Sequence, residues 1–124
     1  RLTEKKSGID QVQISLQWPA LWGDARYWAE HNTYDTLEAG ARFHHRLVQI
    51  HPFPNGNGRH ARIVTDAMLE DYFGHDPIRW ADGFNLQADN RRRNAYIAAL
   101  RSADKGNFLP LFAFVGAKAK APSK

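Results

Sequence analysis

The segment 51–62 gathers the residue types that transfer of a phosphate-containing group requires. It reads His-Pro-Phe-Pro-Asn-Gly-Asn-Gly-Arg-His-Ala-Arg. His51 is a base that can accept a proton near neutral pH. Arg59 and Arg62 lie three positions apart, so on a helix they share a face, and their planar guanidinium groups suit phosphate oxygens. The segment therefore predicts a site that binds and moves a phosphate-bearing group.

Gly56 and Gly58 offer a second means of binding an anion, because glycine lets the backbone adopt positive φ and come close to a ligand. Apolar periodic sequence on both sides indicates helix, tight loop, helix. The start of a helix presents unpaired N–H groups and the positive end of its dipole. Purely structural interpretations remain open: an Asn-Gly turn forms for geometry alone, and a His before Pro can cap a helix end. A turn alone would not need both arginines.

The same segment resembles the signature of the Fic (Fido) family, His-x-Phe-x-Asp/Glu-Gly-Asn-Gly/Lys-Arg-x-x-Arg. The matching residues are His51, Phe53, Gly56, Asn57, Gly58, Arg59 and Arg62. The chain departs from the pattern at Asn55, where the family has an acid. Residues 42–50 and 96–101 are similar to the branch called mobile mystery protein B, and the resemblance extends over about residues 1–115.

The resemblance implies a protein adenylyltransferase, which moves AMP from ATP to a Ser, Thr or Tyr hydroxyl of a target protein and releases pyrophosphate. It makes His51 the general base, and Phe53 the side chain that holds the loop to the core. The nucleotide-binding residues that it implies are Asn55, Gly56, Asn57, Gly58, Arg59 and Arg62. Such a reaction needs positioning and charge stabilisation more than covalent help from the protein.

Asn55 bears on the metal, because the family's acid at this position holds Mg²⁺ against the phosphates. An amide oxygen can bind Mg²⁺, but it carries no charge and binds a hard cation more weakly. Three interpretations follow: Mg²⁺ held mainly by the nucleotide, a slow site or one with another nucleotide, or nucleotide binding without turnover.

Two further function classes stay open beside adenylyl transfer. The family's Doc branch transfers the γ-phosphoryl group, but it has Lys where this chain has Gly58. A nucleotide-binding or protein-binding module without catalysis is the other alternative, and Asn55 is its main support.

The N-terminal residues 1–16 alternate partly between apolar and polar types, which predicts a short hairpin or extended stretch. In the family a β-hairpin flap pairs with an extended segment of the target, a mode known as strand addition. The target-docking flap that the resemblance implies consists of Lys5, Lys6, Ser7, Gly8 and Ile9. The alternative is a disordered end of the chain.

Helical periodicity predicts helices at about 19–32, 36–50, 57–73, 88–104 and 109–119. Pro19 suits the first turn of the first helix, and Asp35 or Thr36 suits the N-cap of the second. Gly74 suits the end of the third. The expected fold is all-α, a Fic-type helical bundle with a small β-hairpin flap near the N-terminus.

With 124 residues, 43% hydrophobic content and four tryptophans, the composition is that of one folded domain. The absence of cysteine excludes disulfides and thiol chemistry. We expect residues 1–117 to form the Fic domain core, without the N-terminal helices of the family, because the chain begins at Arg1 rather than Met. We expect residues 118–124 to be a flexible basic tail.

The net charge of +4 and the pI of about 9.6 raise the question of nucleic acid, but no recognised nucleic-acid-binding motif is present. The cluster Arg91-Arg92-Arg93 is either the exposed face of a helix or a contact for phosphate or an acidic target.

No apolar run is long enough for a membrane span. Of His44 and His45, one is expected to be a hydrogen-bonded core residue, and His60 a surface residue. The histidine spacing does not favour a zinc site.

The partners that the resemblance implies are the target protein and an antitoxin or inhibitory helix, which would pair with Arg62. The 124-residue sequence contains no Ser/Thr-x-x-x-Glu-Gly/Asn pattern, which is typical of that inhibitory helix. The resemblance favours a bacterial cytoplasmic protein, with secretion as an effector as the alternative.

Overall fold

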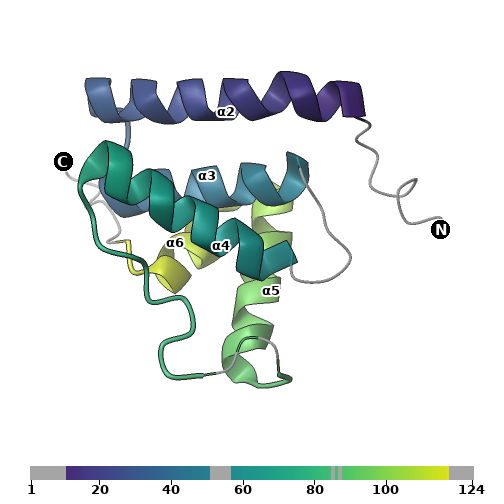
Figure 1. The fold of residues 1–124 in the computed structure, drawn as a ribbon. Helices are drawn as coiled ribbons and strands as arrows, with labels where there is room; N and C mark the ends of the chain where they lie inside the picture. The colour runs from purple at the N-terminus through teal and green to yellow at the C-terminus, as the bar shows by residue number, and fades with distance from the viewer. Residues whose placement is uncertain (1–10, 51–56, 85, 87, 118–124) are drawn as a thin grey trace. The chain divides into compact units, whose positions relative to one another are not determined.

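The computed structural model describes residues 11–50, 57–84, 86 and 88–117. The chain falls into two compact units, Arg1–Pro77 and Ile78–Lys124. Throughout the described residues the regular secondary structure is helical, without a strand (Figure 1). In these residues no helix combines the length and the apolar character needed to cross a membrane.

The first unit is built around its middle helix. Its helices are α2 (Gln11–His31), α3 (Thr36–Ile50), α4 (Asn57–Met68) and the π-helical turn η1 (Leu69–Phe73). Both α2 and α4 pack against α3 (Figure 1). The turn η1 contacts α2 and α3. The prediction of a helix over 36–50 is confirmed, and the carbonyl of Asp35 accepts its first backbone hydrogen bond, from Ala39 N–H at 2.8 Å.

Helix α3 is buried around more than half of its circumference. Its buried residues are Ala39, Gly40, Ala41, Phe43, His44, His45, Leu47 and Ile50. At 100° per residue these positions cannot lie on a single narrow stripe. The pattern follows from the packing of α3 between α2 and α4.

The start of α2 corrects the expectation for the N-terminal segment. The predicted hairpin or extended stretch is wrong over 11–16, because α2 begins at Gln11 and continues through Pro19. Leu16 is 64% exposed, so the apolar alternation does not mark the buried face of a strand. Pro19 lies inside the helix rather than in its first turn, at a cost of about 3 kcal/mol for the lost hydrogen bond and the ring clash. The predicted flap residues Lys5 to Ile9 lie outside the described residues.

One face of α2 contributes apolar and aromatic side chains to the core. Leu21 and Ala25 are completely buried. The Trp22 ring meets Phe43 of α3 edge-on at 5.1 Å and Tyr72 of η1 at 5.8 Å between centroids. Such edge-to-face contacts add to the free energy gained by burying the rings. They hold α2 and η1 against the same part of α3.

The predicted helix 57–73 is confirmed in extent, but it changes character before it ends. After Met68 the last turn widens into η1, and Gly74 closes it with φ 63°. The N–H of Gly74 donates to Glu70 O at 3.2 Å, and that of His75 to Leu69 O at 3.1 Å. Glycine is suited to this left-handed position, so the predicted stop at Gly74 is confirmed.

The second unit contains α5 (Arg91–Asp104) and α6 (Leu109–Val115), which pack against each other. Helix α5 begins three residues later than predicted, because the Asn90 side chain caps it and accepts a hydrogen bond from Arg93 N–H at 2.9 Å. Helix α6 ends at Val115 rather than near residue 119, since Gly116 turns left-handed with φ 88°. The predicted tail, 118–124, lies outside the described residues.

Arg92 ties together three parts of the second unit. Its Nε donates to Trp80 O at 2.9 Å, and its Nη2 donates to Phe114 O at 3.1 Å. The guanidinium carbon also lies 3.8 Å from the centroid of the Phe114 ring, a cation–π contact. The interpretation of Arg91-Arg92-Arg93 as an exposed helix face is therefore wrong for Arg92, which links the 78–80 segment, α5 and α6.

Candidate functional site

The first half of the signature, residues 51–56, lies outside the described residues. The predicted base His51 and the predicted metal ligand Asn55 belong to this segment, together with Gly56. Their predicted roles therefore stay predictions. Asn57 and Gly58 open α4, so the second half of the signature is the beginning of a helix.

Arg59 and Arg62 occupy the first turns of α4, where the sequence predicted them. Arg59 is exposed and Arg62 is partly buried. The beginning of a helix carries unpaired backbone N–H groups and the positive end of the helix dipole, so it favours an anion. Two guanidinium groups here make this end of α4 suited to phosphate.

Behind α4 a buried polar link joins it to α3. His44 and Thr65 are both completely buried, and His44 Nδ1 lies 3.3 Å from Thr65 Oγ1. The Thr65 hydroxyl donates in turn to Ala61 O at 2.8 Å. The sequence predicted that one of His44 and His45 is a hydrogen-bonded core residue. It did not predict Thr65 as the partner, because that contact depends on how α3 lies against α4.

Burial lowers the pKa of His44 from 6.5 to about 3, because the charged ring would lose its hydration. A hydrogen bond with the Ala61 backbone acts in the opposite direction, while the positive charge of Arg62 and the charge on His45 lower the pKa further. His44 is therefore neutral at physiological pH, and Arg62 is close enough for its charge to act on the ring.

The other histidines of this region divide between core and surface. His45 is buried beside His44, so both members of the pair are core residues, whereas one was predicted. His60 is exposed, as predicted. Within the described ranges no three His, Cys, Asp or Glu residues lie together in a way that could hold a metal ion.

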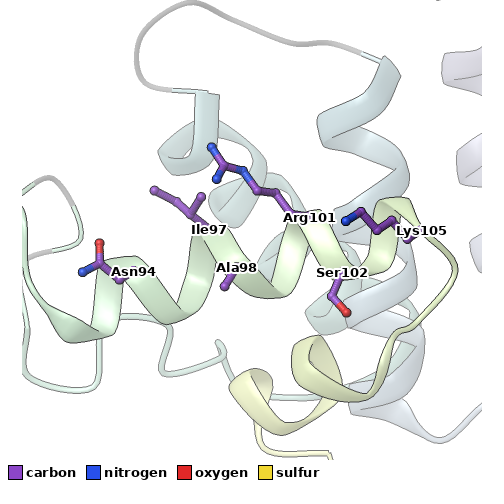
Figure 2. Close-up of a pocket in the computed structure, with 6 residues that line it drawn as sticks. All are labelled: Asn94, Ile97, Ala98, Arg101, Ser102 and Lys105. Carbon is purple, nitrogen blue, oxygen red and sulfur yellow. The ribbon is translucent and has the colours of Figure 1, made fainter.

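A shallow hollow of 590 Å³ runs along α5 in the second unit (Figure 2). Its lining residues are Asn94, Ile97, Ala98, Arg101, Ser102 and Lys105. Arg101 and Lys105 are both exposed and lie one helical turn apart, so this surface favours negative charge. No residue predicted for the site lines this hollow, and the sequence signal for it was only the i, i+4 spacing of the two cations.

Comparison with known families places the signature in context. The model of the Fic/DOC family matches residues 10–69, which include α2, α3, α4 and the whole signature. Through these residues the chain belongs to the Fic/DOC family. The predicted family is thus confirmed, while its narrower branch stays a prediction.

The curated relatives carry the same name in distant organisms. The chain is 38% identical over 74 residues to a probable protein adenylyltransferase of Aquifex aeolicus, covering 60% of this chain and 20% of that protein. It is 37% identical over 81 residues to the protein adenylyltransferase Fic of Nematostella vectensis, covering 64% and 16%. It is 32% identical over 89 residues to the protein adenylyltransferase fic-1 of Caenorhabditis elegans, covering 72% and 16%.

The chain thus spans a fifth or less of the length of these relatives. No solved structure matches the chain significantly.

Proposed function

We propose that the chain carries the catalytic signature of a protein adenylyltransferase, which moves AMP from ATP to a hydroxyl group of a target protein. The observation that carries the proposal is the signature 51–62, which continues into α4 with Arg59 and Arg62 on its first turns. Relatives named as protein adenylyltransferases support the same reaction.

In the proposed reaction His51 accepts the proton of the target hydroxyl. The hydroxyl oxygen then forms a bond with the α-phosphorus of ATP. The bond between that phosphorus and the oxygen bridging to the β-phosphate breaks, and pyrophosphate leaves with the bonding electrons. The histidine stays protonated until it returns the proton to solvent, so each turnover restores the base.

The residues after the base bind the phosphates. Arg59 and Arg62 neutralise the β- and γ-phosphates, which carry the charge that develops on pyrophosphate as it leaves. Asn57 and the backbone N–H groups near Gly56 and Gly58 hold the phosphate chain in line with the incoming hydroxyl. Because such a transfer depends largely on positioning, these groups would contribute to the rate alongside the base.

The donor set of the signature fits Mg²⁺ that is held chiefly by the nucleotide. Asn55 offers a neutral amide oxygen, which is a weaker ligand for a hard cation than a carboxylate. When bound, Mg²⁺ would neutralise part of the phosphate charge.

The decisive experiment compares ATP labelled on the α-phosphate with ATP labelled on the γ-phosphate, in a lysate with Mg²⁺. We expect protein bands labelled only from the α-phosphate, and their loss in His51→Ala. The exposed, non-signature variant His31→Ala is the matched control and should label like the wild type. Label only from the γ-phosphate would replace this proposal with phosphoryl transfer.

A second candidate function is nucleotide binding with little or no turnover, and Asn55 is the observation that favours it. Absence of any label, together with measurable ATP binding, would support this alternative. The phosphoryl-transferring alternative has less support, because Gly58 stands where that branch has Lys.

The proposal includes partners of the whole protein. The target would be a protein with an accessible Ser, Thr or Tyr, docked by strand addition to the segment Lys5 to Ile9. An antitoxin or inhibitory helix would act on Arg62, and the bacterial cytoplasm is the proposed location.

A further inference from the structure

The interface between α3 and α4 contains buried polar atoms, and burying apolar atoms there would require less free energy. His44 and Thr65 are completely buried, and their Nδ1 and Oγ1 atoms lie 3.3 Å apart. Removing an imidazole and a hydroxyl from water costs free energy that their hydrogen bonds return only in part. A contact of this kind therefore calls for a role beyond cohesion.

A hydrogen bond differs from an apolar contact in having a direction. Apolar side chains tolerate small rotations of one helix against another, whereas a donor and an acceptor meet at one angle and one distance. The Thr65 hydroxyl is itself fixed by Ala61 O at 2.8 Å, one turn earlier in α4. The link thus fixes the rotation of α4 about its own axis, measured against α3.

Arg62 lies within the turn that this link spans, between Ala61 and Thr65. A helix rotates as a rigid body, so a rotation of α4 moves the root of the Arg62 side chain sideways. The long side chain then carries its guanidinium away from a fixed phosphate. Arg59, three positions earlier on the same helix, would move with it.

We propose that His44 and Thr65 are positioning residues of the nucleotide site, which hold α4 at the rotation that aims Arg62 at the terminal phosphates of ATP. This inference rests on the proposed nucleotide-binding function of Arg62. Arg62 directly follows Ala61, whose carbonyl accepts a hydrogen bond from the Thr65 hydroxyl, and its positive charge contributes to lowering the pKa of His44. The ring is neutral near pH 7, so it does not repel the guanidinium that it helps to place.

The test compares the affinities for ATP and for AMP, because only ATP carries the phosphates that Arg62 would contact. Thr65→Val keeps the shape of the side chain and removes the hydroxyl, whereas Thr65→Ser keeps the hydroxyl. We expect Thr65→Val to weaken ATP binding about tenfold, which is the lower end of the loss in affinity seen when residues that support a binding site are replaced. AMP binding should change by less than about twofold, since a rotated arginine does not touch it.

Thr65→Ser should bind ATP like the wild type, since it retains the donor to Ala61 O and the group facing His44. His44→Asn and His44→Leu form a second pair, because Asn can place a polar nitrogen near the position of Nδ1 and Leu cannot. We expect the ratio of ATP to AMP affinity to fall in His44→Leu and to recover at least partly in His44→Asn. Circular dichroism and thermal unfolding identify any variant that fails to fold, and the other pair then decides.

An unchanged ATP to AMP ratio in a folded Thr65→Val or His44→Leu variant would overturn the inference, as would an equal loss of both ligands. In either of these outcomes the proposed function would still stand if the wild type binds both ATP and AMP and the Arg62→Ala variant loses affinity for ATP alone. A wild-type chain that binds neither nucleotide would overturn the proposed function, and the inference with it.

Discussion

Asn55 stands where the Fic signature has an acid, and a single side-chain atom separates the amide from the carboxylate. An amide oxygen has no formal charge, so Mg²⁺ at this position would depend on the charges of the nucleotide. In the proposed reaction the rate would therefore depend on this one residue, while His51 and both arginines match the family signature.

We expect Asn55→Asp to increase α-phosphate label transfer about tenfold or more, because a carboxylate binds the hard cation that the phosphates need. The measurement is the initial rate of label transfer at several Mg²⁺ concentrations. The increase should be largest at low Mg²⁺, where the neutral ligand limits binding. A rate that does not respond to Asn55→Asp at any Mg²⁺ concentration would show that this position does not serve the metal.

At this scale the sequence predicted the family signature, but not the buried contact between His44 and Thr65 that lies beside it. The signature could be recognised because each of its residues has a distinct chemical type at a fixed spacing. The partner of His44 could not, because Thr65 is 21 residues away and meets it only when two helices pack. Periodicity places a residue on a face, but it does not say which polar atom lies opposite.

At the scale of secondary structure, the helices were predictable and several of their ends were not. Helix α5 begins at Arg91 and not at about residue 88 as predicted, because the Asn90 side chain caps it. Gly116 ended α6 early by adopting positive φ. Pro19 is the opposite case, a residue that usually begins a helix and here lies inside one. Each outcome reflects a local preference that competes with the packing of the whole helix.

Arg92 provides a prediction at this scale, since it bonds to main-chain oxygens of two other segments. Arg92→Met keeps much of the aliphatic length but removes the donors to Trp80 O and Phe114 O. We expect a loss of about 2 to 3 kcal/mol in the stability of the second unit, because buried carbonyls would lose charged donors. The measurement is denaturant unfolding followed by the fluorescence of Trp80, with the other tryptophans replaced by Phe.

The matched control is Arg93→Met on the next position of α5, whose side chain makes none of these bonds to Trp80 or Phe114. If Arg92→Met and Arg93→Met cost the same, the effect belongs to helix propensity or charge and not to the link made by Arg92.

For the molecule as a whole, His44 makes stability depend on pH. Its folded-state pKa is about 3 and its ordinary value 6.5, so between these limits the unfolded chain binds a proton that the folded chain excludes. The free energy of unfolding therefore falls as the pH drops through this window. Above pH 6.5 the contribution of neutral His44 to stability is complete. At 1.36 kcal/mol per pKa unit, the loss of unfolding free energy at the acid limit is on the order of 5 kcal/mol.

With Trp80 replaced by Phe, so that only Trp18, Trp22 and Trp28 report, we expect urea unfolding to show most of this loss between pH 7 and pH 4. A His44→Gln variant should lose less over the same range, because Gln does not titrate. His31→Gln, at an exposed position, should follow the wild type. Equal pH dependence in the His44→Gln variant and the wild type would contradict the prediction.

The division of the chain into two units was not predicted, whereas the all-helical class was. Class follows from local periodicity, which is strong in α3 and α4. Units are defined by which distant segments touch, and no short window of sequence carries that information. The signature helix belongs to the first unit, and the Arg92 link belongs wholly to the second.

The double covering of α3 also determines the order in which the backbone can open to solvent. Helix α3 packs against α2 on one side and α4 on another, so we expect its amide hydrogens to exchange only when both of these interfaces separate. In deuterated water we expect the slowest exchange between Phe43 and Ile50, and faster exchange in both flanking helices. The most protected backbone of the first unit would then end at Ile50, one residue before the proposed base.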